Sequence, residues 1–295
     1  MKILIKILSF SLFLYSLVYL FSETTSVAHK KEDDNTLTFL AVGFDDSPSN
    51  TDVLGVITYD VSQSTFRVIQ IPRDTAVDFD GETVKINSLY AKRVNDGKNH
   101  NEALEELKNF TESLLGVKIN GYLALTSQGF CDVVDFVGGI KINTANLPSA
   151  LVKDMNLISG ENILSGNEAL SLIRYRKGYL RADLDRLDTQ KVFLRALAES
   201  IRIKREKISF LRFLQTNNGI SFSVDKGRAI SFLLENMLKL NASDIQIATL
   251  PGRAEKSSDI WYYVVDRERA KTLVSGYFPH SFIDFDTENK FVYSL

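Results

Sequence analysis

Short apolar runs alternate with amphipathic stretches along most of the chain. Runs rich in β-branched and aromatic residues are typical of strands, and they occupy residues 37–43, 53–59, 66–71, 121–125 and 245–250. The polar residues 60–64 predict a hairpin connection between the second and third runs, and Pro72 ends the third run. The first run, LTFLAVG, is almost uninterrupted by polar residues, which favours a buried strand.

Apolar residues at helical spacing predict helices between and after these strands. The periodicity covers residues 102–115, 127–137, 167–172, 185–203, 224–240 and 266–277. Gly138-Gly139 is expected to end the second helix. The helix at 185–203 is expected to bury the side that carries Leu187, Leu194, Leu197 and Ile201. Strands and helices that alternate in this way predict a layered α/β fold.

The N-terminus predicts export from the cytosol. Lys2 and Lys6 precede an uncharged run at residues 7–22. This run is shorter than the roughly 20 residues that usually span a bilayer, but residues 3–5 extend it if Lys6 snorkels to the headgroups. The positive-inside rule then leaves the N-terminus in the cytosol and the bulk of a single-pass protein outside. A cleaved signal peptide is the alternative, because Ser26-Val27-Ala28 has small residues at the spacing of a cleavage site.

The remaining chain shows no convincing linker. Residues 1–22 are interpreted as the membrane anchor or signal segment, and the polar residues 23–36 as a tether. Residues 37–215 are expected to form the main domain, and residues 216–295 to complete that domain or follow it as an appendage.

Composition excludes several classes of protein. The chain has 35 basic and 37 acidic residues, so it has no overall positive field that would attract nucleic acid. Cys131 is the only cysteine, and the three histidines are scattered, so neither an intramolecular disulfide nor a zinc motif is expected. The chain also lacks a P-loop, a G-x-G-x-x-G motif after a strand and a G-x-S-x-G motif. These absences argue against a nucleotide substrate and against a serine nucleophile of the hydrolase type.

Arginine is concentrated in one stretch of this nearly neutral chain. The stretch holds Arg174, Arg176, Arg181 and Arg186 beside Asp183 and Asp185. Guanidinium groups bind phosphate or carboxylate oxygens in a bidentate way, so the cluster suggests an anion, most plausibly phosphate. Arg186 and Gln190 are four residues apart and share one helix face. A ladder of surface ion pairs with the neighbouring aspartates is the alternative.

Three further groups of charged residues follow predicted strands. Asp45 follows the first strand and Asp52 opens the second, where carboxylates can hold Mg²⁺ or simply cap a solvated turn. Arg73 and Asp74 come just after the third strand, where open α/β sheets place ligands, although a surface ion pair is an equal alternative. Lys85 either adds a positive charge to this site or lies on an exposed polar edge.

In their order and spacing, these motifs resemble the LytR-CpsA-Psr family of cell-wall phosphotransferases. The resemblance runs through most of residues 37–200. It rests on Val42-Gly43-Phe44-Asp45, Asp52, Ile71-Pro72-Arg73-Asp74-Thr75, Lys85-Ile86-Asn87, the segments at 115–122, 134–140 and 164–170, and Arg174-Tyr175-Arg176 with Arg186 and Gln190.

The resemblance implies a bacterial, single-pass membrane protein with an external α/β domain. The expected fold is a layered α-β-α domain with a central mixed sheet, helices on both faces and an apolar tunnel for a lipid tail. The expected reaction takes a glycopolymer, such as teichoic acid or capsule, from a polyprenyl-pyrophosphate carrier. It then attaches the polymer to a peptidoglycan hydroxyl through a phosphodiester.

The resemblance also implies roles for individual residues. Asp45 and Asp52 would serve Mg²⁺, the expected cofactor. Arg73, Asp74 and Arg186 would act in catalysis. Lys85, Arg174, Arg176 and Gln190 would bind the pyrophosphate substrate.

Asn50 is the one departure that matters. The family usually carries arginine two residues before the strand-opening aspartate, and here that position is Asn50. One expected positive charge is therefore absent, which keeps a non-catalytic lipid- or polymer-binding protein open as an alternative. A polyprenyl-pyrophosphate hydrolase, in which water replaces the sugar acceptor, is a further alternative.

Overall fold

The computed structural model describes residues 36–45, 50–60, 63–177, 183–204, 207–223, 245–278 and 290–295. Contacts group Thr36–Leu295 into one compact unit. The expected anchor at 1–22, nearly all of the expected tether and the helix expected at 224–240 lie outside the described residues. Within the described residues, no helix has both the length and the apolar character that crossing a membrane requires.

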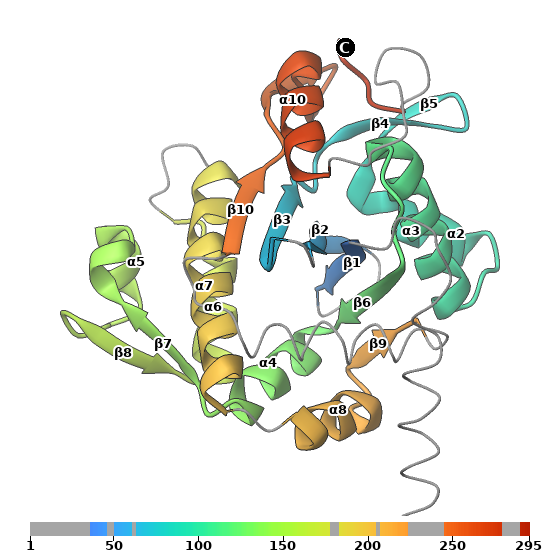
Figure 1. Cartoon of the computed structure of the whole chain (residues 1–295). Coiled ribbons are helices and arrows are strands. Elements are labelled where there is room, and N and C mark those ends of the chain that lie inside the picture. The colour runs from blue at the N-terminus through green and yellow to red at the C-terminus, as the bar shows by residue number, and fades with distance from the viewer. Residues whose placement is uncertain are drawn as a thin grey trace, which may run out of the picture. The chain divides into compact units, whose positions relative to one another are not determined.

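A six-stranded mixed sheet forms the centre of the fold (Figure 1). Strands β1, β3, β6 and β10 run in one direction, and β2 and β9 run in the other. In spatial order the strands are β10 (Ile245–Thr249), β3 (Thr65–Ile71), β2 (Thr51–Asp60), β1 (Thr36–Phe44), β6 (Gly121–Leu125) and β9 (Ile220–Phe222).

Helices cover both faces of this sheet, because successive side chains of each strand point to opposite faces. Leu40, Val42 and Phe44 of β1 pack with α2 (Leu89–Asn95), α3 (His100–Leu115) and α10 (Arg267–Tyr277). Phe39 of β1 packs instead with α4 (Ser127–Phe136), α7 (Asp183–Lys204) and α8 (Lys207–Thr216). Figure 1 shows α2 and α3 on one side of the sheet and α4, α6 (Gly166–Arg174) and α7 on the other. The predicted α-β-α layering around a mixed sheet is confirmed.

Three small two-stranded units extend from this core, and the sequence patterns did not predict them. They are β4 (Ala76–Phe79) with β5 (Glu82–Lys85), β7 (Ile140–Asn143) with β8 (Glu161–Leu164), and β11 (Gly252–Ser257) with β12 (Ile260–Val265). The short helices η1 (Ile86–Ser88), η2 (Thr144–Asn146) and α5 (Ser149–Asp154) accompany the first two units.

Local capping explains where the predicted helices begin and end. Asn99 and Glu102 form a capping box, so α3 starts two residues before the predicted position. Gly116 then ends α3 with a positive φ of 66°. Thr126 caps α4, and Gly138 and Gly139 follow it with φ near 90°, as expected for residues that end a helix.

A close approach between α4 and α6 provides a stability prediction. A Cβ added at Gly166 would lie 2.5 Å from the Cys131 carbonyl oxygen, which is main chain and cannot rotate away. Gly166→Ala is therefore expected to lower the free energy of unfolding by about 1–3 kcal/mol, measured from denaturant midpoints. Gly276→Ala in α10 is the matched control, since no atom of the described residues lies within 4 Å of its added Cβ. A loss at Gly276 as large as that at Gly166 would contradict the steric explanation.

Candidate active site

One edge of the sheet collects most of the predicted site residues. The carboxyl ends of β1, β3 and β6 meet there with the first residues of the antiparallel β2. Asp45 directly follows β1, Asp52 is the second residue of β2, and Arg73 comes two residues after β3. The direction of each strand, together with its length, is what brings these separate segments to the same edge.

A cavity of about 160 Å³ lies between the sheet and the helices α4, α6 and α7. Small residues of the sheet, including Ala41, Gly43 and Gly55, leave the space for it. Its wall is mostly apolar, with Leu123, Leu125, Phe130, Leu170, Ile173, Phe193, Leu194 and Leu197 among its members. A mostly apolar interior suits an apolar ligand group.

Four of the predicted site residues line this same cavity, namely Asp52, Arg174, Arg186 and Gln190. Arg186 is only 3% exposed and Gln190 only 6%, so the helix-face prediction for this pair is confirmed. Burying a guanidinium group in mostly apolar surroundings is costly unless charged or polar oxygens approach it. Arg186 lies on the cavity wall, so its guanidinium group could contact an anion that enters the cavity.

Arg73 connects the cavity to the protein surface. Its Nη1 lies 2.7 Å from Oδ1 of Asp52, and its Nε lies 3.9 Å from Oδ2 of Asp74. Nζ of Lys85 lies 2.8 Å from Oδ1 of Asp74. All four side chains are between 22% and 30% exposed, so they form a half-buried row of alternating charges. The row joins members of all three groups of charged residues that follow the predicted strands.

Main-chain bonds hold this row in place. The backbone N–H and the hydroxyl of Thr75 both donate to the Pro72 carbonyl, at 3.0 and 2.6 Å, and close a turn around Arg73 and Asp74. The Asn87 N–H donates to the Arg73 carbonyl at 3.2 Å, which sets the segment after Lys85 against this turn. The charged side chains are therefore presented by a fixed backbone.

Arg174 and Arg176 take different positions. Arg174 is the last residue of α6, and its Nη2 donates to Oγ of Ser127 at 2.5 Å. Tyr175 is extended, with φ −59° and ψ 137°, so the chain leaves the helix there. Arg176 is exposed and does not belong to the residues that line the cavity. Arg181 and the side chain of Asp183 lie outside the part of the chain that the structure describes.

Two carboxylates are available for a metal ion. The structure shows no group of three or more His, Cys, Asp or Glu side chains that could hold a metal within the residues it describes. Mg²⁺ is commonly bound through only one or two carboxylates, with water and substrate phosphates completing the coordination. Asp45 and Asp52 lie on adjacent strand ends, so this pair of donors fits such a site.

The sequence analysis missed three polar residues of the cavity, Gln70, Thr126 and Ser127. Nε2 of Gln70 donates to the Leu187 carbonyl at 3.4 Å, and the hydroxyl of Thr249 donates to Oε1 of Gln70 at 3.2 Å. Gln70 thereby ties β3 and β10 to the start of α7, next to Arg186. A lone glutamine inside the apolar run FRVIQI is the sequence signal that could have identified it.

Comparisons with known proteins show the family to which this chain belongs. TagU of Oceanobacillus iheyensis, a polyisoprenyl-teichoic acid–peptidoglycan teichoic acid transferase, is 27% identical over 257 residues, which cover 84% of this chain and 77% of that protein. The Bacillus mycoides protein of the same name is 30% identical over 221 residues, with coverages of 73% and 68%. The crystal structure of Bacillus subtilis TagV aligns with a TM-score of 0.65 and 23% identity, covering 85% of this chain and all of that chain. The sequence model of the LytR_cpsA_psr family matches residues 20–276. The chain therefore belongs to the LytR_cpsA_psr family.

Proposed function

We propose that this protein is a Mg²⁺-dependent phosphotransferase that moves a glycopolymer from a polyprenyl-pyrophosphate carrier to peptidoglycan. The observation that carries the proposal is an apolar cavity that is lined by Arg174, Arg186 and the carboxylate of the Asp52–Arg73 pair. Such a cavity suits a ligand with a hydrocarbon tail and an anionic head. The names of the relatives, which are teichoic acid transferases acting on peptidoglycan, support the same conclusion.

The reaction requires one phosphorus–oxygen bond to form and one to break. The acceptor hydroxyl oxygen bonds to the phosphorus that bears the polymer. The bond from that phosphorus to the bridging oxygen breaks, and polyprenyl phosphate leaves with the bonding electrons. The hydroxyl proton passes to a base, for which Asp74 is the candidate because it lies beside Arg73 at the surface end of the charged row.

The chain's own residues supply charge and position for this step. Phosphoryl transfer depends mainly on alignment and on neutralising the charge that builds up on the phosphate oxygens. Arg174 and Arg186 would hold the diphosphate at the cavity, and Arg73 would hold it from the side of the charged row. Gln190 would donate from the same face of α7 as Arg186, while Lys85 and Arg176 would contribute charge from further out.

Mg²⁺, when bound, would polarise the phosphoryl oxygens as a Lewis acid. Asp45 and Asp52 are the residues that would hold it. Because Asp52 also pairs with Arg73, the same carboxylate would set the distance between the metal ion and a phosphate-binding arginine.

The proposed location is the outer surface of a bacterial membrane. Residues 1–22 would form a single-pass anchor, so that the domain from residue 37 onward meets the lipid carrier at the membrane and peptidoglycan beyond it. A substrate that joins a membrane-embedded tail to a cell-wall polymer makes this location necessary for the reaction.

The proposal is tested with the purified full chain in two steps. Mass spectrometry of the extracted lipid should find a polyprenyl phosphate or pyrophosphate. The chain should then transfer a synthetic polyprenyl-pyrophosphate-linked saccharide to peptidoglycan fragments when Mg²⁺ is present. Release of phosphate at the same rate without acceptor would indicate the hydrolase instead, and lipid retention without Mg²⁺-dependent turnover would indicate a binding protein.

Asn50 provides a separate prediction. Asn50 is exposed and lies two residues before Asp52, at the start of β2. A guanidinium group at this position would therefore have room to extend beside the strand ends that carry the site. Asn50→Arg is expected to raise kcat for transfer by about tenfold, because each well-placed phosphate contact is worth roughly 1–3 kcal/mol. Asn50→Gln, which adds length without charge, is the control and should leave kcat unchanged. An equal gain in both variants would show that charge is not the missing property.

A further inference from the structure

Ser127 lies where three elements of the candidate site meet. It is the first residue of α4, it is buried, and it lines the cavity. Arg174, the last residue of α6, contacts it from one side. Phe44, the last residue of β1 and the one before Asp45, contacts it from another. A single hydroxyl therefore touches both a phosphate-binding candidate and the strand end that carries a metal-ligand candidate.

The contact with Arg174 orients a guanidinium group. Nη2 of Arg174 donates to Oγ of Ser127 at 2.5 Å, although the two residues are 47 positions apart in the sequence. A guanidinium has five N–H donors, and this bond uses one of them. The acceptor is an uncharged hydroxyl, whereas Nη1 of Arg73 lies 2.7 Å from the carboxylate of Asp52. The bond to Ser127 therefore fixes Arg174 without itself neutralising the charge that an anion in the cavity would meet.

The hydrogen of the same hydroxyl points to the main chain of β1. Oγ of Ser127 donates to the Phe44 carbonyl at 3.4 Å, and this contact is buried. A hydroxyl can donate one bond and accept two, so both contacts of Ser127 are satisfied together. The ring of Phe44 packs on the ring of Tyr90 in α2, with 4.6 Å between the centroids. Ser127 is therefore held by a carbonyl whose own residue is anchored in the core.

The Phe44 carbonyl lies at an irregular point of the sheet. The pairing of β1 with β2 shifts its register between Gly43 and Phe44, so that Asp52 falls between two paired positions of β2. Such an irregularity commonly re-aims the extra side chain, and Asp52 does line the cavity. Ser127 thus bonds to β1 at the level of Asp52, directly before Asp45.

We infer that Ser127 is a positioning residue that fixes the guanidinium of Arg174 relative to Asp45 and Asp52. The inference rests on the proposed function. In that function Arg174 and the metal ion held by the two carboxylates must meet one diphosphate, and phosphoryl transfer depends mainly on such alignment. A guanidinium that is already held in place loses less rotational freedom when the diphosphate binds.

The cap of α4 is a separate contact, which allows the role of Ser127 to be tested. The hydroxyl of Thr126, not that of Ser127, accepts from the Gly129 N–H at 3.0 Å at the start of the helix. Removing the Ser127 hydroxyl therefore leaves the helix cap in place. A change in ligand binding can then be assigned to the contacts of Ser127 with Arg174 and Phe44.

Binding of a lipid diphosphate gives the first test and needs no turnover. The full chain, stripped of lipid, is titrated calorimetrically with geranylgeranyl diphosphate in the presence of Mg²⁺. Ser127→Ala is expected to raise Kd about tenfold, the usual weight of one hydrogen bond to a charged group. Ser127→Thr keeps the hydroxyl and can place its methyl group in the cavity, so its Kd should stay close to that of the unaltered chain.

Ser113→Ala is the matched control for loss of a hydroxyl. Ser113 is exposed on α3, and its Oγ donates to the Asn109 carbonyl at 3.1 Å, remote from the residues that line the cavity. This variant should bind geranylgeranyl diphosphate as tightly as the unaltered chain. A Kd that is unchanged in Ser127→Ala, or raised equally in Ser113→Ala, would overturn the inference.

A double substitution separates positioning of Arg174 from a general effect on the fold. In a chain that already carries Arg174→Ala, adding Ser127→Ala should weaken binding no further, because the group it positions is gone. The same loss in both backgrounds would show a purely structural role and overturn the inference. Coupled loss in a chain that binds the diphosphate but transfers nothing would count against the proposed function alone, whereas an unaltered chain that binds no lipid diphosphate would overturn both.

Discussion

Replacing Arg186 with lysine is expected to slow polymer transfer by about 10²- to 10³-fold, the usual loss for one well-placed donor to a developing anion. Lysine keeps the charge but loses the planar fork that binds two phosphate oxygens at once. Arg186 is almost fully buried at the cavity, so water cannot replace the missing contact. The substitution is expected to lower kcat/KM for the lipid-linked donor. This constant is measured by the transfer of a labelled saccharide to peptidoglycan fragments.

Arg195→Lys is the matched control for this substitution. Arg195 lies nine residues further along α7, which places it on the opposite side of the same helix, and its side chain is exposed. The control should transfer at the rate of the unaltered protein and melt at the same temperature as Arg186→Lys. If Arg186→Lys transferred at the unaltered rate with its fold intact, the assignment of the diphosphate to this cavity would be wrong.

Asp52→Asn is expected to produce the second large effect. The amide keeps the shape of the side chain but removes the negative charge that pairs with Arg73 and that would hold Mg²⁺. Two functions of one residue would be lost together, so transfer should fall by at least 10²-fold. A titration of rate against Mg²⁺ concentration should show that the variant needs much more Mg²⁺ to reach half of its own maximal rate.

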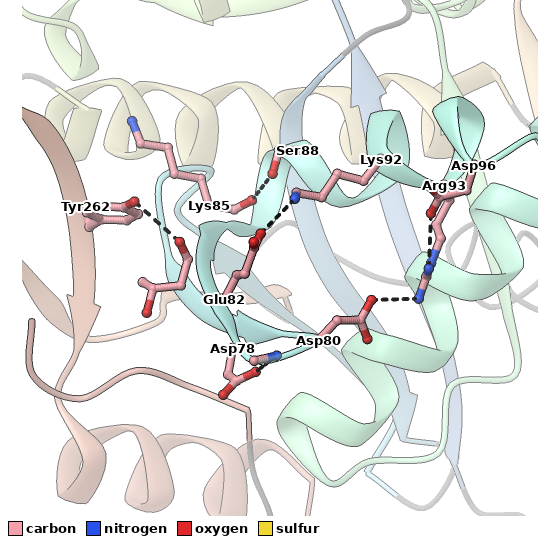
Figure 2. A network of polar contacts seen from close by, with 11 residues as sticks. Asp78, Asp80, Glu82, Lys85, Ser88, Lys92, Arg93, Asp96 and Tyr262 are labelled. Atoms are coloured by element: carbon pink, nitrogen blue, oxygen red, sulfur yellow. Dashed lines mark hydrogen bonds and ion pairs between the residues drawn. The ribbon is translucent and has the colours of Figure 1, made fainter.

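Asp80→Asn is the control for the carboxylate-to-amide change. Asp80 lies on the exposed β4–β5 turn with φ 56°, a conformation that asparagine tolerates well. Figure 2 shows its ion pair with Arg93, which at 3.8 Å and with the Asp80 side chain exposed contributes little to stability. If Asp52→Asn needed no more Mg²⁺ than the unaltered protein, Asp52 would not be a metal ligand. If that variant were also slow at every Mg²⁺ concentration, the only remaining role of Asp52 would be to position Arg73.

The main elements of the fold could be predicted because their signals are local. The strand at β6 coincides with the predicted run, and α7 follows a periodicity that extends over five turns. The β11–β12 ribbon was missed because one of its strands, GRAEKS, has almost no apolar residue and is stabilised by its partner IWYYVV. The four-residue strands of the β7–β8 hairpin are too short to show a period.

The sequence could predict those site residues whose positions follow from helix periodicity or from the end of a strand. Arg186 and Gln190 share a face of α7, and that face does line the cavity. Arg176 does not line it, because α6 ends at Arg174 and the extended Tyr175 changes the direction of the chain. Contacts such as Arg174 with Ser127 and Gln70 with Leu187 join residues 47 and 117 positions apart, and no local pattern contains them.

The size of the cavity has a consequence for the protein's stability. At about 160 Å³ it is close to engineered cavities of about 150 Å³ that hold one benzene molecule, so a long isoprenoid chain exceeds it. Only part of such a chain would therefore lie in the cavity. Leu194 and Leu197 would then pack on hydrocarbon that is not part of the polypeptide. The bound carrier would thus contribute apolar contacts to the hydrophobic core and stabilise the folded state. Removal of the carrier by extraction is therefore expected to lower the melting temperature of the protein.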